Sequence, residues 1–525
     1  MDTKHYRTSL WIGLFSILGL LAVPLMARPV MATPHGSTPA GTKIDAFVRD
    51  QVQRHGIPGL ALAVVEGDRI VHLQGYGKAD QTGRAVTAQT PFVLASTSKP
   101  LTALAVMQLV EAGKVALDAP VQRYLPTFRV ADPVASQQIT VRHLLTHTSG
   151  IPERGCQNSR FGAETLEQFV AALRTIELDA PVGTRHFYCS GNYNVLGRII
   201  EVVSGQSFGT YMQQHVFAPL QMRHSFTAEQ AAKRDGLAQG YWWLFGWPVP
   251  MDYPYDVAQM PSGFLISSAE DMAHFLIAQL NGGRLGASSV LSPDGIAAMH
   301  APGVATGAGE ETYGLGWKTG ALGGVPVVYH DGAHPNARTS LVMEPAARRG
   351  AVLLMNSSGL LQDLTAFTEI KAGVARLLAG QAPAPVSALS LRRLYLIVDA
   401  VLGGLFALAL WPVLRLRWWE QRLRQQPYVD RRRLLRIGLR LVWEFGVPLT
   451  LLIGARLLLS ALDAQSWEEG LLLFPDVGAW LWAISLLVLL TGATRLVLTL
   501  RVLRHANGKR GVAGPEARPT RGHRT

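Results

Sequence analysis

A serine and a lysine three residues apart form the most informative pattern in this chain. Ser96-Thr97-Ser98-Lys99 is the only Ser-x-x-Lys tetrad in the 525 residues, and it opens an apolar run with helical spacing. Because residues three apart share a helix face, Lys99 Nζ is expected beside Ser96 Oγ, where burial would lower its pKa and let the amine accept the hydroxyl proton. Free N–H groups at a helix N-terminus would stabilise an oxyanion. The tetrad predicts an acyl-transfer nucleophile; a chance tetrad on a solvated helix is the alternative.

Two other patterns could form chemical sites. His143 and His147 have a spacing that could suit a metal, but no carboxylate pattern accompanies them, so we expect no metal and no cofactor. Residues 205–209 match Gly-x-Ser-x-Gly around Ser207. They follow a helical pattern that ends near Val203, whereas a nucleophile elbow needs a preceding strand. We therefore expect a helix stop at this position.

The elements that must position Ser96 come from both ends of a long segment. Strand-like runs at 59–65 and 69–77 flank a Glu-Gly-Asp hairpin signal, and a helical pattern precedes them at 43–56. Helical patterns dominate from 101 to about 211. Further strands are expected at 325–330, 339–343 and 351–355, followed by a helix near 361–378. The order predicts an α/β (α+β) fold, with one antiparallel sheet flanked by helices and a helical insertion.

Three apolar spans near the C-terminus predict membrane helices. They cover 394–414, 441–462 and 477–500, each about long enough to cross a bilayer. The ionisable residues within them are expected to face the bundle interior or an interface. These residues are Asp399, Glu444, Arg456 and Arg495.

The charge distribution predicts the orientation of these spans. Arginines crowd into 415–440 and 501–524, whereas the loop at 463–476 is acidic. By the positive-inside rule the two basic segments are cytoplasmic, and residues 33–390 face outward. The net charge of +12 is therefore interpreted as membrane topology rather than nucleic-acid binding.

The N-terminus has the pattern of an export signal. Lys4 and Arg7 precede an apolar run that ends near small residues suited to cleavage; because the run is long, an uncleaved anchor is the alternative. The expected organisation is a signal peptide at 1–32, an exported domain at 33–385, three transmembrane helices within 386–505, and a basic cytoplasmic tail at 506–525.

Taken in order, three motifs resemble those of the serine β-lactamase and penicillin-binding-protein superfamily, particularly its class C-like branch, peptidase family S12. They are Ser96-Thr97-Ser98-Lys99, Tyr188-Cys189-Ser190 and His330-Asp331-Gly332, joined by the phrases at 143–150 and 313–317. The resemblance covers about residues 43–375. It implies a β-lactamase/transpeptidase-like domain and a serine hydrolase that forms an acyl-enzyme.

The resemblance also implies a role for each motif. Ser96 would carry the acyl group, while Lys99 and Tyr188 share general acid and base duty, with a nearby ammonium favouring tyrosinate. Gly332 would let the substrate approach the strand, and the N–H groups of Ala333 and Ser96 would form the oxyanion hole.

Two motif positions carry less settled roles. His330 would either bind a substrate carboxylate or orient Tyr188, and the second is favoured. Ser190 replaces the asparagine of the usual Tyr-x-Asn motif and lacks the amide that would hold a β-lactam side chain. Efficient β-lactam turnover is therefore not expected.

The layout as a whole resembles the membrane-anchored periplasmic prodrug peptidases, such as the colibactin-maturing peptidase, which remove an N-acyl-D-Asn cap. Pro335-Asn336 after the third motif matches that group. His334 stands where those enzymes carry a substrate-contacting asparagine. Val93 and Gln259 replace an expected acidic residue and histidine. A different side chain or a different amide substrate is therefore expected.

The expected function is a membrane-anchored, extracytoplasmic serine hydrolase acting on acylated or D-residue-containing peptides. Alternatives are an esterase, a D-Ala carboxypeptidase or β-lactamase-like enzyme, and a non-catalytic penicillin-binding sensor. Expected partners are an amide or ester substrate, the lipid bilayer and an exporter, with no nucleic acid.

Cys156 and Cys189 are the only cysteines, and both fall in the exported segment. An oxidising compartment permits a disulfide, and two free buried thiols are the alternative. Because Cys189 lies within the second motif and Cys156 follows a phrase that lines the same cleft in relatives, we expect them to pair.

Overall fold

An eight-stranded antiparallel sheet organises the domain that carries the motifs. The computed structural model describes residues 39–153, 165–384, 386–425, 431–461 and 475–510. The sheet order is β2-β1-β14-β13-β12-β11-β10-β9, and both N-terminal strands join the C-terminal ones through the pairing of β1 with β14. The strands are β1 (Gly59–Glu66), β2 (Arg69–Gly77), β9 (Val304–Ala305), β10 (Thr312–Tyr313), β11 (Lys318–Leu322), β12 (Val325–His334), β13 (Ala337–Glu344) and β14 (Arg349–Met355). The predicted antiparallel sheet built from both chain ends is confirmed.

The side chains of β1 point in turn to opposite faces of the sheet, and both faces are covered by helices. Ala61, Ala63 and Val65 contribute to the larger core, whereas Leu60 and Leu62 contribute to a second core on the opposite face. Successive side chains of a strand point to opposite faces, so a strand that is apolar at every position must be buried on both sides.

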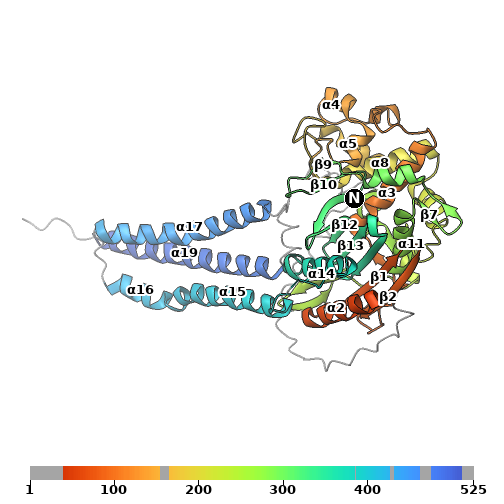
Figure 1. Ribbon diagram of the computed structural model, residues 1–525. Coiled ribbons are helices and arrows are strands. Elements are labelled where there is room, and N and C mark those ends of the chain that lie inside the picture. Colours follow the sequence, from red (N-terminus) through yellow and green to blue (C-terminus); the bar gives the residue numbers. More distant parts are fainter. Residues whose placement is uncertain (1–38, 154–164, 385, 426–430, 462–474, 511–525) are drawn as a thin grey trace, which may run out of the picture. The chain divides into compact units, whose positions relative to one another are not determined.

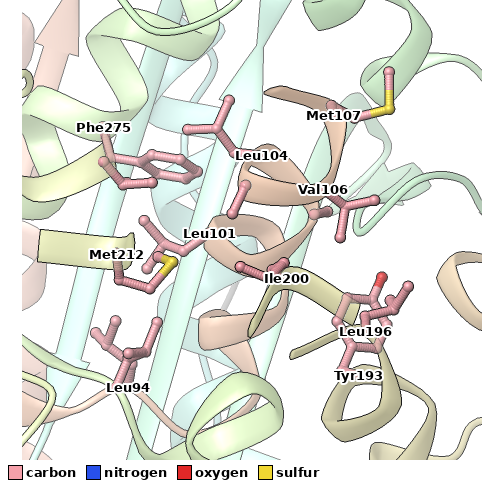
Figure 2. Packing of buried hydrophobic residues seen from close by; sticks show 14 of the residues in the cluster. Leu94, Leu101, Leu104, Val106, Met107, Tyr193, Leu196, Ile200, Met212 and Phe275 are labelled. Atoms are coloured by element: carbon pink, nitrogen blue, oxygen red, sulfur yellow. The ribbon is translucent and has the colours of Figure 1, made fainter. Parts of the chain in front are cut away.

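The second core is closed by α2 (Pro39–His55) and α14 (Thr368–Leu378), which lie side by side across the sheet (Figure 1). The larger core is closed by α3 (Ser98–Glu111), α8 (Ser190–Ser204) and α11 (Ala269–Leu280). Figure 2 shows Leu101 and Leu104 of α3 among residues of its neighbours, including Ile200 and Phe275. Nearly all of α3 is buried, as expected of a helix that is apolar on every side.

The helical insertion between the two groups of strands is also confirmed. Its helices include α4 (Pro133–Gln138), α5 (Val141–Leu145), α7 (Leu166–Ala172), α8, α9 (Phe208–Met212) and α10 (Glu229–Arg234), and α12 (Pro293–His300) follows α11. The short strands are β3 (Phe92–Val93), β4 (Tyr241–Leu244), β5 (Trp247–Pro250), β6 (Ile266–Ser267), β7 (Arg284–Leu285), β8 (Ser288–Ser289) and β15 (Ser357–Ser358). α8 ends at Gly205 in the left-handed conformation (φ 72°), and Ser207 accepts the Thr210 N–H to begin α9. The helix stop expected within residues 205–209 is therefore confirmed at Gly205.

Long helices follow the sheet domain, but only two of the three expected membrane spans are recovered. Within the described residues, Leu391–Arg422 and Pro475–Val502 are long and apolar enough to cross a bilayer. The helices are α15 (Leu391–Leu414), α16 (Leu416–Gln425), α17 (Arg431–Ala461) and α19 (Pro475–Arg510). The expected middle span falls on α17, whose sequence includes Arg440 and Glu444, and the last expected residue, 462, lies outside the described residues. The correction is from three candidate spans to two.

Polar residues in these helices contact one another, as expected. Arg495 of α19 forms an ion pair with Glu444 of α17, and both side chains are buried. Trp480 Nε1 donates to Asp399 Oδ1 at 3.0 Å, which joins α19 to α15. Burial of an ionised side chain is costly unless it is paired, so this pairing explains how the helices accommodate these residues. The side chain of Arg456 lies outside the described part of the chain.

Candidate active site

Ser96 and Lys99 meet as their spacing predicts. Ser96 lies in a single 3₁₀ turn, η2 (Ala95–Thr97), and Lys99 lies in the first turn of α3. Lys99 Nζ is 3.0 Å from Ser96 Oγ. Ala95, just before the serine, has a φ of 49°, which is uncommon for a residue other than glycine and is a form of backbone strain often found at functional sites. The sequence predicted the pair but not the strained turn.

The Lys99 ammonium is enclosed by acceptors from distant parts of the chain. Its Nζ donates to the carbonyl oxygen of Ser262 at 2.8 Å and lies 3.4 Å from Ser190 Oγ. Ser262 belongs to η7 (Met260–Phe264), a π-helical turn. The side chain of Lys99 is fully buried. These contacts aim the nitrogen at Ser96 while excluding water from it.

Burial sets the proton affinity of this amine. It lowers the pKa of Lys99 to about 7, and the nearby Glu153 carboxylate opposes that shift. A large fraction of the Lys99 side chains is therefore uncharged near neutral pH. A neutral amine within hydrogen-bond distance of a serine hydroxyl can act as its general base.

Tyr188 lies in the irregular segment before α8, and its side chain contacts Ser96. Its side chain hydrogen-bonds Ser96, and its ring centroid is 4.8 Å from Lys99 Nζ. Burial raises the pKa of Tyr188 well above its ordinary value, and the bond to Ser96 offsets only part of that rise. The phenol therefore keeps its proton at neutral pH. This direction is opposite to the expected tyrosinate, because burial penalises the charged phenolate, and it favours Tyr188 as a proton donor.

Ser190, the third residue of the second motif, begins α8. Its backbone N–H donates to Glu153 Oε2 at 2.6 Å, while its hydroxyl faces Lys99. Glu153 thereby places a carboxylate at the N-terminus of α8, close to the Lys99 amine. Nothing in the type or spacing of Glu153 distinguished it in the sequence.

Gly332 of β12 lies against the turn that carries Ser96. A Cβ at this position would collide with Thr339 Oγ1 and the Leu94 carbonyl, and would lie 3.1 Å from Ala95 Cβ. Only glycine permits this approach. The close approach is consistent with the expected oxyanion pair of Ser96 and Ala333 backbone N–H groups, which remains a prediction.

His330 has a different environment from either role expected for it. Its Nδ1 donates to the Asp331 carbonyl at 2.8 Å, so Nε2 is unprotonated and accepts from the Tyr313 hydroxyl at 2.9 Å. The side chain is buried, and burial lowers its pKa well below the ordinary value. A neutral, buried imidazole that already holds Tyr313 is unsuited to a substrate carboxylate, and its hydrogen bond goes to Tyr313 rather than Tyr188.

His334 and Asn336, which follow the third motif, differ in their contacts. Asn336 is buried and donates to the Met251 carbonyl at 3.1 Å, so it anchors a neighbouring loop. The centroid of the His334 ring lies 4.5 Å from the ring centroid of Phe264 and 5.3 Å from that of Tyr253. Phe264 ends the turn that contains Ser262, so His334 lies beside the site. Asn336 instead contacts the loop that contains Met251.

His143 and Cys189 lie against backbone groups of neighbouring residues. His143 Nδ1 accepts the Thr140 N–H in a capping box for α5, which explains its presence without a metal. Cys189 is buried, with its Sγ 3.8 Å from the Pro152 carbonyl oxygen. Cys156 and the expected signal peptide lie outside the described residues, so the disulfide and the signal stay predictions.

Comparison with known proteins agrees with this geometry. The sequence pattern of the beta-lactamase family matches residues 44–374, which is more than half of the chain. The chain belongs to the beta-lactamase family. The match spans both halves of the sheet and all three motifs, so the family assignment expected from the motifs is confirmed.

Two curated relatives show the range within this beta-lactamase family. Penicillin-binding protein 4 of Amycolatopsis lactamdurans is 33% identical over 324 residues, covering 58% of this chain and 81% of the relative. Protein flp of Staphylococcus aureus strain MW2 is 27% identical over 326 residues, covering 60% of this chain and 62% of the relative. The alignment thus spans less than two thirds of the staphylococcal protein.

Solved structures carry the same beta-lactamase-family fold. The octameric penicillin-binding protein homologue from Pyrococcus abyssi aligns with a TM-score of 0.57 and 27% identity, covering 69% of this chain and 81% of that one. EstCE1, described as a hydrolase with promiscuous acyltransferase activity, aligns with a TM-score of 0.56 and 22% identity, covering 63% and 97%. At that identity EstCE1 supports the fold alone.

Proposed function

We propose that this protein is a membrane-anchored serine hydrolase of the S12 type that cleaves an amide through an acyl-enzyme on Ser96. The observation that carries the proposal is the 3.0 Å contact between Ser96 Oγ and a fully buried Lys99 whose pKa is lowered to about 7. That pair supplies an activated nucleophile at neutral pH without a metal or cofactor.

The reaction follows from the proton states of the two neighbours of Ser96. Neutral Lys99 accepts the Ser96 proton as Oγ attacks the substrate carbonyl, and the N–H groups of Ser96 and Ala333 bind the resulting oxyanion. Tyr188 then donates its proton to the leaving amine as the carbon–nitrogen bond breaks, and the Lys99 ammonium returns a proton toward the phenolate. Water, activated in the same way, attacks the acyl-enzyme and releases the acid with Ser96 restored.

The substrate class and the location are part of the proposal. We infer an acylated or D-residue-containing peptide, processed outside the cytoplasmic membrane as in prodrug maturation. The apolar helices at 391–422 and 475–502 and the flanking arginines support a membrane anchor with the catalytic domain outside. An exporter that delivers the peptide would be the natural partner of such an anchor.

A second candidate is covalent penicillin binding with slow release. The observation that favours it is the 33% identity to a protein named as a penicillin-binding protein. Fluorescent penicillin, applied to the full chain in detergent and followed over time, separates the two functions. Label that appears and is then released supports hydrolysis, whereas label that persists supports a sensor, and absence of label leaves β-lactams outside the substrate range.

A further inference from the structure

His147 occupies a strained, fully buried position in the loop after α5. Its φ of 56° lies in the left-handed region, and its side chain has no exposed surface. Histidine, asparagine and aspartate tolerate this conformation better than other non-glycine residues, but it is still uncommon. Such a conformation persists only when the surrounding contacts fix it, so the contacts of His147 indicate what the strain achieves.

Those contacts hold the backbone on both sides of Tyr188. The His147 carbonyl accepts the Phe187 N–H at 2.7 Å, and His147 Nδ1 accepts the Cys189 N–H at 3.2 Å. The imidazole also lies against the tyrosine, with ring centroids 4.4 Å apart. One residue therefore holds the backbone N–H groups of Phe187 and Cys189, on either side of Tyr188, and packs against the tyrosine ring.

The proton arrangement on His147 follows from its partners. A backbone N–H can only donate, so Nδ1 must be unprotonated and the ring proton must reside on Nε2. Asn192 reinforces this assignment: its Oδ1 accepts from Ser149 Oγ at 2.8 Å, which leaves its Nδ2 to donate to His147 Nδ1 at 3.3 Å. The histidine thus serves as an acceptor in this arrangement, and the donor–acceptor pattern is consistent from Ser149 through to Cys189.

We propose that His147 is a positioning residue whose backbone carbonyl and Nδ1 hold Tyr188 at hydrogen-bond distance from Ser96. This inference rests on the proposed function, in which Tyr188 donates a proton to the leaving group. It predicts that a His147 substitution lowers the same step that depends on the Tyr188 hydroxyl. Misplacement of a catalytic group by about 1 Å can cost about 10²-fold in rate.

The leaving group of the substrate distinguishes this role from general structural damage. Ethyl butyrate and p-nitrophenyl butyrate give the same acyl-enzyme, but only the ethoxide leaving group needs a proton donor. The experiment compares kcat/KM for both esters in wild type, His147→Ala, His147→Asn and Tyr188→Phe. Asparagine retains a δ-acceptor and tolerates the left-handed backbone, whereas alanine leaves a comparable cavity with no acceptor.

The expected result is a loss of about 10- to 100-fold on ethyl butyrate in His147→Ala, a much smaller loss on p-nitrophenyl butyrate, and recovery of most activity in His147→Asn. The double variant His147→Ala with Tyr188→Phe should be no slower than Tyr188→Phe alone. If His147→Ala does not fold, His147→Gln, which moves the acceptor by one bond, takes its place.

Equal losses on the two esters, or additive losses in the double variant, would overturn the role of His147. Failure of the proposed function has a different signature: wild-type protein that neither hydrolyses p-nitrophenyl butyrate nor reacts with a fluorophosphonate probe at Ser96. The two failures are therefore distinguishable in one set of measurements.

Discussion

Glu153 Oε2 accepts the backbone N–H of Ser190 at 2.6 Å, which places a carboxylate beside the residue whose hydroxyl faces Lys99. Burial lowers the pKa of Lys99, and the charge of Glu153 raises it. The two effects together bring that pKa to about 7. The proposed mechanism requires the neutral amine, so this relationship connects Glu153 to the pH range in which we expect activity.

The first prediction concerns that pH range. Turnover should fall as the pH decreases through about 7, since Lys99 becomes protonated. Glu153→Gln removes the charge but retains an acceptor for the Ser190 N–H. Loss of the negative charge lowers the pKa of Lys99 further, so the acidic limb of the kcat/KM profile should shift to lower pH. Glu167→Gln, at a carboxylate that is 74% exposed, is the matched control and should leave the limb in place. A limb that stays fixed in Glu153→Gln would contradict the assignment of Lys99 as the base.

The second prediction concerns Tyr188. Tyr188→Phe removes one hydroxyl and keeps the ring that packs against His147 and Lys99. Thermal unfolding should be little changed, while amide turnover should drop by ~10²–10⁴-fold, the usual scale for a lost general acid or base. Steady-state kinetics beside a melting curve checks both. Near-normal turnover in this variant would leave Lys99 as the sole proton carrier.

The third prediction concerns the close approach of β12 to the nucleophile turn. Gly332→Ala should abolish acylation, because the new Cβ would collide with Thr339 Oγ1 and the Leu94 carbonyl and push the strand away from Ser96. Gly320→Ala on β11 is the control, since its Cβ would meet nothing closer than 3.6 Å. Fluorophosphonate labelling of both variants measures the effect. Full labelling of Gly332→Ala would show that this approach is dispensable.

How much the sequence predicted depended on how far apart the contacting residues lie. Ser96 and Lys99 are three residues apart, and central strands of the sheet such as β1 and β14 are continuous apolar runs, so both the contact between these two side chains and the sheet were predictable. The supporting groups come from elsewhere in the chain. Ser262 and Lys99 are 163 residues apart in the sequence, and His147 and Cys189 are 42 residues apart. No local sequence pattern predicts contacts between residues so far apart.

The environment of His330 also depends on a residue that is distant in the sequence. Its motif position suggested a role toward substrate or Tyr188, but its role depends on Tyr313, which reaches it from a different strand. The expected middle span at 441–462 was likewise based on apolar length, although Glu444 and Arg456 lie within it. The pairing of Glu444 with Arg495 on another helix is a tertiary contact that hydropathy does not report.

The fourth prediction concerns topology. We proposed that the arginine-rich segments at 415–440 and 501–524 lie in the cytoplasm and that the catalytic domain lies outside. That arrangement requires an odd number of crossings between the domain and the C-terminus, so α17 must cross in addition to the two candidate spans. A reporter fused after Pro385 should behave as exported, and one fused after Thr525 as cytoplasmic. Alkaline phosphatase, which is active outside the cytoplasmic membrane, and a fluorescent protein that is active in the cytoplasm are the two reporters. If both positions report the same side, α17 does not cross the membrane.

The most direct test of the account is covalent labelling of Ser96. Intact-mass measurement of the full chain after fluorophosphonate treatment should show a single adduct that maps to Ser96. Ser96→Ala should lose both the adduct and all turnover, and Lys99→Ala should be slowed by at least ~10³-fold, because members of a catalytic group act as a unit. An adduct or substrate hydrolysis that persists in Ser96→Ala would contradict the central claim that this serine is the nucleophile.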